Sequence, residues 1–311
     1  MARYVGKRIL LMIPVLLGIA FIIFSIMEFT PGDPAKLILG ENATEEAVAQ
    51  LHQEMGLDDP FLVRFVRYVA DAVQGDLGES YRTGLSVQEE IMSRLPVTMK
   101  LAMVSILLAI GIGVPIGIYS AVRQYSLGDN LFRMLAMTLN AVPGFWLGLM
   151  LMMKFALELS WFPATGVTSW KSYVLPSIAL CTGTAASLVR MTRSAMLDVV
   201  RQDYIRTARA KGAGELLVIM GHALQNALLP VVTAIGMSFG GLMGGAIVTE
   251  SVFALPGLGT LMINSIRMKD VPLVLASVLY VAVITGVVSL LVDILYAYID
   301  PRIKVQYERQ R

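Results

Sequence analysis

Long apolar runs without a charged residue dominate this sequence. Six of them are between 17 and 22 residues long, and a helix of ~20 residues crosses the ~30 Å hydrocarbon core of a bilayer. Membrane barrel strands would instead alternate apolar and polar residues over ~10 positions, which no part of the chain does. The pattern therefore predicts an all-α membrane protein with six transmembrane helices. The predicted spans are Ile9–Met27, Leu101–Val122, Met134–Met153, Tyr173–Val189, Ala227–Val248 and Val271–Val292.

Composition supports the same class and excludes several others. Of the 311 residues, 56% are hydrophobic and 15% are charged, and the mean hydropathy is +0.68. A soluble domain of this size could not bury so much apolar surface. The single cysteine, Cys181, excludes a disulfide scaffold, and two histidines leave little for a haem or zinc site. A net charge of +2 gives no argument for a nucleic-acid partner.

The basic residues indicate how the helices are oriented. Fifteen of the 25 Lys and Arg residues fall in the segments 1–8, 123–133, 190–225 and 298–311. The segment 30–100 holds twelve acidic and six basic residues. Because cytoplasmic loops carry the excess of Lys and Arg, both termini are predicted to be cytoplasmic. The remaining loops, 30–100, 154–172 and 249–270, are then extracytoplasmic.

The segment 30–100 is long enough to fold on the outer face. Asp59-Pro60 predicts a helix that is capped by the aspartate and has proline at its first position. Phe61, Phe65, Val69 and Val73 follow at every fourth residue, an apolar stripe that needs a partner surface. The capping box in 86–89 predicts a second short helix. We expect a small helical cap within a single transmembrane domain over 1–311.

Gly236-Met237-Ser238-Phe239-Gly240 matches the G-x-S-x-G pattern of hydrolase nucleophiles. That motif needs a strand-to-helix turn, a base and a carboxylate, whereas here it lies inside a predicted membrane helix. An intramembrane serine hydrolase is thus the distant alternative. The glycines of this run, with Gly241, Gly244 and Gly245, are more typical of small-residue ridges on which two helices pack closely in lipid.

An ion-driven carrier is the other alternative, and such proteins place charges at the middle of the membrane. Lys154 and Glu158 are four residues apart near the end of the third run, which predicts a pair on one helix face. No charge lies at the middle of a predicted span, and no nucleotide-binding G-x-x-x-x-G-K-[ST] motif occurs.

Polar and helix-breaking residues interrupt the third run. Asn140 is costly in lipid unless it faces protein or water, and Pro143 frees a backbone carbonyl. This face is predicted to line a translocation pathway, with the fifth helix opposite; helix–helix packing is the alternative. The pathway candidates are Asn140, Pro143, Phe145, Trp146, Met237 and Ser238.

The loop between the fourth and fifth runs carries an ordered pattern. Residues 203–211 favour a helix, Gly212 suits a left-handed stop, and a second helical stretch extends to His222. A basic loop that only sets topology would not need this order, although that interpretation remains open.

The stretch 203–212 resembles the cytoplasmic EAA loop of ATP-binding cassette (ABC) importer permeases, in the form found in the dipeptide/oligopeptide/nickel permease family. Five further segments agree in order and depth. They are Pro31-Gly32-Asp33-Pro34, Gly56-Leu57-Asp58-Asp59-Pro60, Gly75-Asp76-Leu77-Gly78, the segment 253–259 and Asp300-Pro301-Arg302-Ile303. Arg206 stands where the general pattern has a glutamate, Leu229-Pro230 lies farther from Gly212, and Leu255 replaces a frequent aromatic residue.

The resemblance implies a type I ABC importer permease with six helices in the bacterial inner membrane, and no enzyme activity of its own. Its implied partners are a second homologous permease, two cytoplasmic ATPase subunits that bind ATP and Mg, and an extracytoplasmic substrate-binding protein. The implied cargo is a dipeptide or oligopeptide; nickel, a metallophore or glutathione are the alternatives.

The resemblance also implies roles for residues in two segments. The loop 190–226 would couple the permease to an ATPase, and 253–259 would form an outer gate or re-entrant segment. The implied coupling residues are Asp203, Tyr204, Arg206, Ala208, Arg209, Lys211, Gly212 and Glu215, and the implied gate residues are Phe253, Pro256, Gly257 and Gly259.

Overall fold

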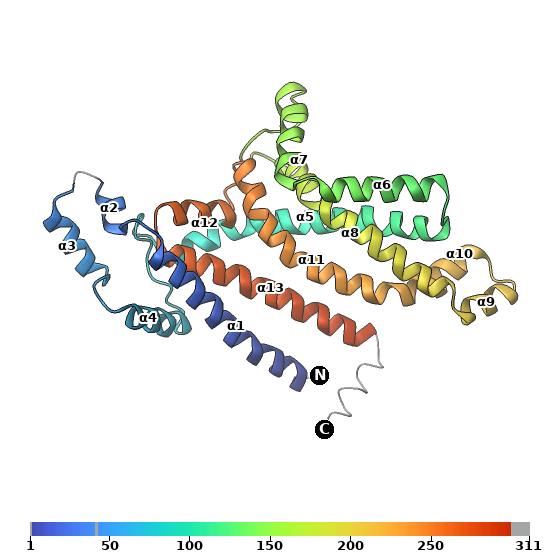
Figure 1. Cartoon of the computed structure of the whole chain (residues 1–311), viewed down its shortest axis with the longest axis horizontal. Coiled ribbons are helices and arrows are strands. Elements are labelled where there is room, and N and C mark those ends of the chain that lie inside the picture. Colours follow the sequence, from blue (N-terminus) through green and yellow to red (C-terminus); the bar gives the residue numbers. More distant parts are fainter. Residues whose placement is uncertain (1, 41–42, 300–311) are drawn as a thin grey trace. The chain divides into compact units, whose positions relative to one another are not determined.

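The computed structural model describes residues 2–40 and 43–299 (Figure 1). Regular structure in these residues is helical, and one isolated bridge joins Glu79 to Ser86. The helices are α1 (Ala2–Phe29), α2 (Pro34–Leu39), α3 (Glu45–Glu54), α4 (Phe61–Val73), α5 (Val87–Val122), α6 (Leu127–Ala141), α7 (Gly144–Leu151), α8 (Val174–Val200), α9 (Asp203–Ala210), α10 (Glu215–Leu217), α11 (Leu224–Val252), α12 (Leu258–Arg267) and α13 (Val271–Ile299). Two π-helical segments, Met152–Glu158 and Val218–Ala223, continue α7 and α10, and a short 3₁₀ turn, Trp170–Tyr173, precedes α8.

Five helical stretches of the described residues are long and apolar enough to cross a membrane. They are Val5–Phe29, Val87–Val122, Trp170–Val200, Glu215–Val252 and Val271–Leu295. A sixth crossing is made if the pair Leu127–Ala141 and Gly144–Glu158 counts as one span, although the two helices are bent by 98°. The third predicted run is therefore a broken helix and not a straight one, because Pro143 at the bend cannot continue α6.

Contacts divide the chain into two compact units. The first unit consists of Met1–Thr98 and Pro256–Gly286, and the second of Met99–Leu255 and Val287–Arg311. Helices α5 and α13 contribute residues to both. The single domain over 1–311 stays a prediction, and each unit is described by itself.

In the first unit, α4 packs its aromatic stripe on α1. The rings of Phe61 and Phe65 meet those of Phe21 and Phe24 edge-on, with centroids 5.2 to 5.9 Å apart. The Phe61 and Phe65 end of the predicted stripe thus has α1 as its partner surface, whereas Val73 at the other end is 82% exposed. The predicted aspartate cap is wrong: Pro60 occupies the cap position, and α4 begins at the next residue.

The reason for this shift is that the neighbouring carboxylate is used elsewhere. Asp59 accepts a hydrogen bond from Arg67 Nη2 at 2.5 Å, so its oxygen does not cap the helix. The second predicted short helix is also wrong in extent, because α5 runs from Val87 to Val122 without a stop. Val87 and Ile91 are fully buried in a cluster with Leu258 and Leu273 of α12 and α13, and this packing keeps the first turns of α5 helical.

Two adjacent charged residues between α12 and α13 tie the first unit together. Asp270 is 2% exposed and accepts hydrogen bonds from Ser80 Oγ at 2.5 Å and the Tyr81 N–H at 3.3 Å. Lys269 has a φ of 55° and donates from its ammonium to the carbonyls of Thr30 and Gly32. The end of α1 and the loop before α5 are thereby fixed to the α12–α13 junction.

In the second unit, α8 is the central helix and packs against α5, α6, α7 and α11. Glycines on α5 permit the close approach: a Cβ on Gly113 would lie 2.7 Å from Leu188 Cβ, and one on Gly117 would lie 2.6 Å from Thr192 Cβ. This Gly-x-x-x-Gly pair was not singled out in the sequence, because its helix was assigned by hydropathy alone.

The glycine ridge predicted on α11 is confirmed at two positions. A Cβ on Gly236 would lie 2.4 Å from Val292 of α13, and one on Gly245 would lie 2.8 Å from Leu180 of α8. Gly241 and Gly244 have open space at that position, so they do not form close contacts. Helix packing uses the two ends of the ridge rather than its whole length.

Candidate functional site

The loop predicted to face the cytoplasm folds as a helix with a glycine stop. Helix α9 ends at Ala210, and Gly212 has a φ of 80°. The N–H of Gly212 donates to the Arg209 carbonyl at 3.0 Å, and that of Ala213 donates to the Ala208 carbonyl at 3.3 Å. These two bonds form a Schellman motif, which needs a residue in the left-handed region. The predicted helix and its stop are both present.

A second contact closes the same turn. The guanidinium of Arg209 donates from Nε to Glu215 Oε2 at 3.0 Å and from Nη2 to Oε1 at 2.6 Å. The two planar groups meet in a bidentate arrangement, which fixes their orientation as well as their distance. Arg209 and Glu215, both predicted as contacts to an ATPase, thus contact each other within this chain, and both remain partly exposed.

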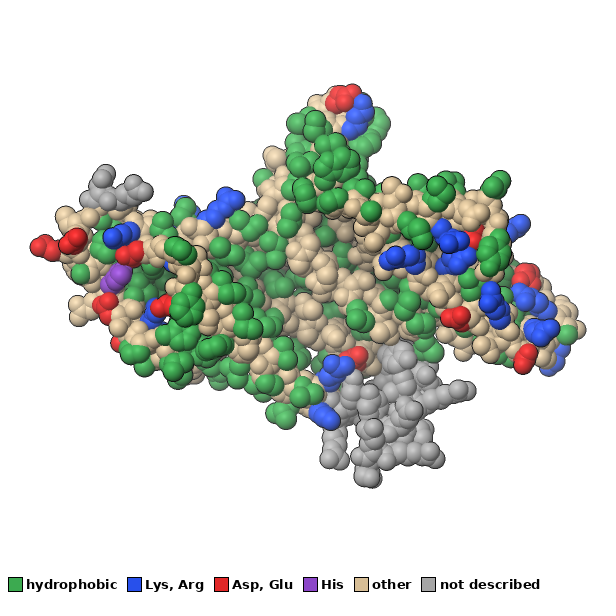
Figure 2. All heavy atoms as spheres, viewed as in Figure 1, with side chains coloured by type: hydrophobic (Ala, Val, Ile, Leu, Met, Phe, Trp, Pro, Cys, Tyr) green, Lys and Arg blue, Asp and Glu red, His purple; other side chains and the backbone are tan. Residues whose placement is uncertain are grey.

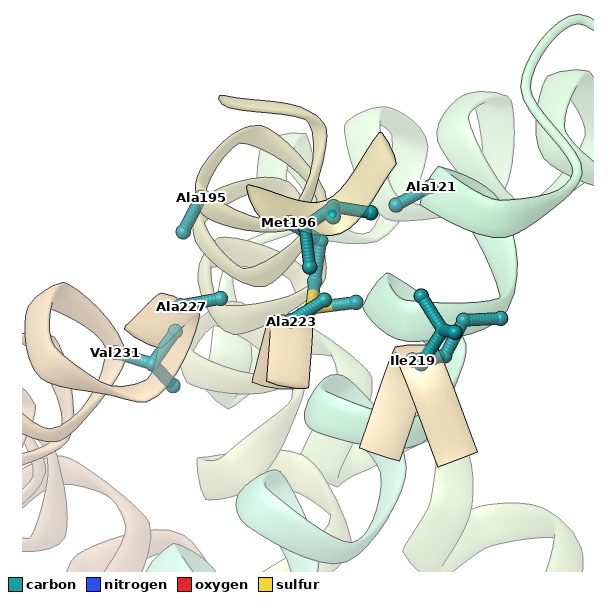
Figure 3. Close-up of a cluster of buried hydrophobic side chains, with 9 residues drawn as sticks. Ala121, Ala195, Met196, Ile219, Ala223, Ala227 and Val231 are labelled. Carbon is teal, nitrogen blue, oxygen red and sulfur yellow. The ribbon is translucent and has the colours of Figure 1, made fainter. Parts of the chain in front are cut away.

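Helix α9 is anchored to the helical body by one side chain. Ile205 is fully buried and belongs to a cluster whose other members come from α5, α8, the π-helical segment and α11. Figure 3 shows these side chains converging from several helices. The other members are Ala121, Ala195, Met196, Val218, Ile219, Ala223, Ala227 and Val231.

Most other side chains of α9 point away from this cluster. Tyr204 is 45% exposed, and the side chains of Asp203 and Arg206 are 99% and 78% exposed. Lys211 is exposed as well, whereas Ala208 is half-buried beside the cluster. Lys and Arg side chains gather over this end of α8 and α9 in Figure 2. The predicted coupling residues therefore form one surface, anchored at Ile205.

The second helical stretch of the loop does not end at His222 as predicted. Residues Glu215–Val252 form one continuous helical stretch of 38 residues, through a π-helical segment and into α11. Burial of Val218, Ile219 and Ala223 against Ile205 keeps the chain helical across the predicted break. The anchored loop is in consequence a direct extension of a membrane helix.

A buried ion pair between α6 and α8, in the same unit as this surface, was missed in the sequence. Asp129 at the start of α6 is fully buried and accepts from Arg193 Nε and Nη2 on α8, both at 2.8 Å. The same carboxylate accepts the Tyr125 N–H at 2.9 Å, and Ser126 Oγ caps the Asp129 N–H at 3.1 Å. The pair locks the first turn of α6 to α8.

The pathway candidates lie on α6, α7 and α11. Asn140 and Pro143 are exposed at the bend, and Phe145 and Trp146 are about half exposed on α7, which projects from α6 in Figure 1. On α11, Met237 is 78% exposed. That these faces line one pathway stays a prediction.

The predicted Lys154–Glu158 pair is confirmed, with Nζ 2.6 Å from Oε1.

Ser238 lies in the middle of α11 and donates from Oγ to the Ala234 carbonyl at 2.7 Å. A nucleophile elbow places its serine at a strand-to-helix turn, so this geometry does not fit a hydrolase.

The gate candidates fall on both sides of the boundary between the units. In the second unit, Phe253 is 1% exposed, its ring stands against Gly148, and its carbonyl accepts the Gly166 N–H at 3.0 Å. In the first unit, Gly257 caps α12, and Thr98 Oγ1 accepts the Leu258 N–H at 2.8 Å. Pro256 is exposed, and Gly259 is buried in the first turns of α12. A gating role for these residues stays a prediction. The segment Asp300–Ile303, one of the five that carry the family resemblance, lies outside the described residues.

Comparison with known families identifies the chain. Residues 113–305 match the model of the binding-protein-dependent transport system inner membrane component, and residues 1–102 match the N-terminal model of the same component. The chain belongs to this family. It is therefore the permease subunit of a binding-protein-dependent ABC importer, a multi-pass protein of the bacterial inner membrane and not an enzyme. Such a permease works with an ATPase and a substrate-binding protein.

Relatives of this permease match over nearly their whole length. A glutathione transport system permease protein of Salmonella paratyphi A is 44% identical over 98% of this chain and 99% of its own. A dipeptide transport system permease protein of Alkalihalophilus pseudofirmus is 43% identical over 98% of this chain and 100% of its own.

Among solved structures, the chain is similar to the MetNI methionine ABC transporter in an inward-facing conformation. The TM-score is 0.59 with 18% sequence identity, over 68% of this chain and 97% of that chain. This similarity supports the fold of an ABC importer permease.

Proposed function

We propose that this permease forms one half of a translocation pathway for short peptides, including glutathione. The two relatives named above are described as transporting a dipeptide and glutathione, and glutathione is itself a tripeptide. A second homologous permease completes the pathway. Two cytoplasmic ATPase subunits bind ATP and Mg and supply the energy, and no cofactor resides in this chain.

The anchored α9 surface is the observation that carries the coupling role. Its exposed side chains, Tyr204, Arg206 and Lys211, offer an aromatic ring and two cations to a partner, while Ile205 holds the helix to the membrane helices. A surface that only set the topology would need the charges but not the buried anchor or the glycine stop. We assign α9 and the turn through Glu215 as the seat of the ATPase.

The same geometry explains how a movement would be transmitted. Helix α9 follows α8 directly, and the turn after Gly212 leads into the continuous stretch that becomes α11. A displacement of α9 by nucleotide-driven closure therefore acts on both membrane helices through Ile205 and its cluster. Asn140, Pro143, Phe145, Trp146, Met237 and Ser238 are proposed to face the pathway, and Phe253, Pro256, Gly257 and Gly259 to form its outer gate.

The first unit is proposed to receive the substrate-binding protein. Its segment 30–100 is net acidic, and the Lys269–Asp270 junction fixes the start of this segment and its residues Ser80 and Tyr81 to the α12–α13 junction. An ordered acidic surface is suited to a docking partner with exposed Lys and Arg.

The test is transport by the complete importer, reconstituted in vesicles with its ATPases, second permease and binding protein. We expect ATP-dependent uptake of a labelled dipeptide or glutathione, with no hydrolysis by the permease alone. Uptake of nickel without peptide uptake would overturn the substrate proposal.

A separate measurement tests the coupling surface. Cysteine at position 204 should cross-link to the ATPase, whereas cysteine at exposed Leu127, outside α9, should not. If cysteine at position 204 fails to cross-link in every nucleotide state, the seat of the ATPase must lie elsewhere.

A further inference from the structure

A groove of about 270 Å³ between α6 and α8 in the second unit is lined by four arginines. Arg190 and Arg193 lie on α8, Arg201 follows its last residue, and Arg133 faces them from α6. Lys and Arg side chains can be seen over these parts of α6 and α8 in Figure 2. None of the residues assigned above to the ATPase seat, the pathway or the gate lines this groove.

The groove has more positive charge than the chain neutralises. Arg193 is bound to Asp129, but Arg133, Arg190 and Arg201 form no ion pair in the part of the chain that the structure describes. Counting the carboxylates of Asp129 and Asp198 against the four guanidinium groups leaves two positive charges in excess. A site of this kind takes an anion with one or two negative charges, and guanidinium groups are well suited to phosphate oxygens.

One end of the groove is apolar, and the arginines line the rest of it together with Ser194, Leu197 and Asp198. The Asp129–Arg193 bond sets the register of α6 on α8, which places Arg133 near the level of Arg190. Met137 and Val189 lie at the end of the groove away from α9, Arg201 lies toward the loop before α9, and Leu197 lies between Arg193 and Arg201. A free phosphate would use the basic part only. A phospholipid would use both, with its head group at the arginines and an acyl chain along Met137 and Val189.

We infer that this groove binds the head group of an anionic phospholipid from the cytoplasmic leaflet. The inference rests on the orientation that the basic loops predict, since anionic lipid and positive loops share that side. Bound lipid would fill the space between α6 and α8, next to the helix that leads into α9, and would place its phosphate between Arg133 and Arg190.

The test uses the purified full-length permease without its ATPases, so that it is independent of the coupling assignment. Native mass spectrometry would measure retention of phosphatidylglycerol, with phosphatidylcholine as the neutral comparison. We expect clear preference for phosphatidylglycerol. In the double variant Arg133→Gln/Arg190→Gln, affinity should fall roughly tenfold or more, because each cation near the surface contributes a several-fold gain.

Two controls separate this inference from misfolding. Arg123→Gln removes an exposed cation outside the groove and should leave phosphatidylglycerol retention unchanged. Arg133→Lys/Arg190→Lys keeps the charge and should recover most of the binding. Thermal midpoints of the variants that match the wild-type value support a direct effect.

Two results would overturn the inference. The first is equal retention of phosphatidylglycerol by the wild type and the double Gln variant. The second is competition by inorganic phosphate or glycerol phosphate as strong as that by the lipid, which would indicate a free-anion site.

Discussion

Arg209 and Glu215 face each other across the Gly212 turn and share two hydrogen bonds, at 3.0 and 2.6 Å. The pair joins the last turn of α9 to the first residue of the stretch that becomes α11, and so holds the coupling helix at one angle to a membrane helix. Because both side chains are partly exposed, the pair stabilises the fold by only ~0.2–1 kcal/mol. Its importance is geometric.

We expect the single variant Arg209→Glu to release the turn and uncouple ATP hydrolysis from uptake. It places two carboxylates at positions 209 and 215, where they repel each other. The exchange Arg209→Glu/Glu215→Arg restores the attraction and should recover part of the coupling ratio, measured as peptide imported per ATP hydrolysed. If the exchanged variant is as uncoupled as the single one, Arg209 acts through an ATPase contact and not through Glu215.

Gly212→Ala should destabilise the turn by about 1 kcal/mol, because an L-residue is strained at a φ of 80°. A Cβ at this position meets nothing within 4 Å, so the cost is conformational and not steric. Gly212→Asn, which tolerates the left-handed region, should transport better than the alanine variant. If the alanine and asparagine variants lose most of their transport to the same extent, glycine is needed for the close approach of a partner and not for its backbone conformation.

Ile205→Ala should loosen α9 without affecting insertion of the membrane helices. Removing a fully buried isoleucine side chain to the Cβ costs ~2–5 kcal/mol, whereas Ile205→Val costs ~0.5–1.5 kcal/mol. Amide hydrogen exchange over 203–212 should therefore accelerate strongly in the alanine variant and little in the valine variant. Unchanged exchange in the alanine variant would mean that Ile205 does not anchor the helix.

Asp129→Asn should destabilise the second unit far more than loss of an exposed pair. The substitution leaves Arg193, whose side chain is 17% exposed, without its charge partner, and such changes cost ~3–5 kcal/mol. Glu158→Gln breaks the exposed Lys154 pair and should cost below ~1 kcal/mol. Denaturant unfolding in detergent micelles compares the two. Similar losses in both variants would contradict the buried-pair interpretation.

Stability of the first unit should depend on the protonation of Asp270. Burial raises the pKa of this carboxyl above its ordinary value of 3.8, and its hydrogen bonds with Ser80 and Tyr81 only partly oppose the rise. A raised pKa in the folded state means that folding favours the protonated form. The contribution to stability is therefore complete below pH 3.8 and is lost as the pH rises through the folded-state pKa.

The measurement is the thermal midpoint of the permease between pH 4 and pH 7, with Asp270→Asn as the comparison. The wild type should lose stability relative to the variant as the pH rises. Asp33 is the internal contrast: burial raises its pKa, but hydrogen bonds from His52 and the Ala35 N–H outweigh this and lower it. Asp33→Asn should thus show the opposite trend, with the wild type losing relative stability as the pH falls below 3.8, so this comparison needs a scan extended below pH 4.

Local sequence signals were reliable where one segment carried all the information. The Gly212 stop, the aromatic stripe of α4 and the Lys154–Glu158 pair each depend on residues within a few positions of one another, and each is present. The predicted breaks between a short helix and the membrane helix that follows it, within residues 86–101 and 215–227, were wrong. Burial of Val87 and of Val218 by distant helices keeps the chain helical through both segments, into α5 and α11.

The sequence by itself determined the helical membrane class, the approximate spans and the exposed basic helix that we assign to coupling. It could do so because a bilayer requires every spanning segment to satisfy its own backbone and to be apolar, and this requirement is local. Only the tertiary structure decided which polar groups meet. Asp129 and Arg193 are 64 residues apart, and Ser80 and Asp270 are 190 residues apart. Burial of these groups is tolerated only because each finds its partner, and that partner is set by how the helices pack rather than by neighbouring residues.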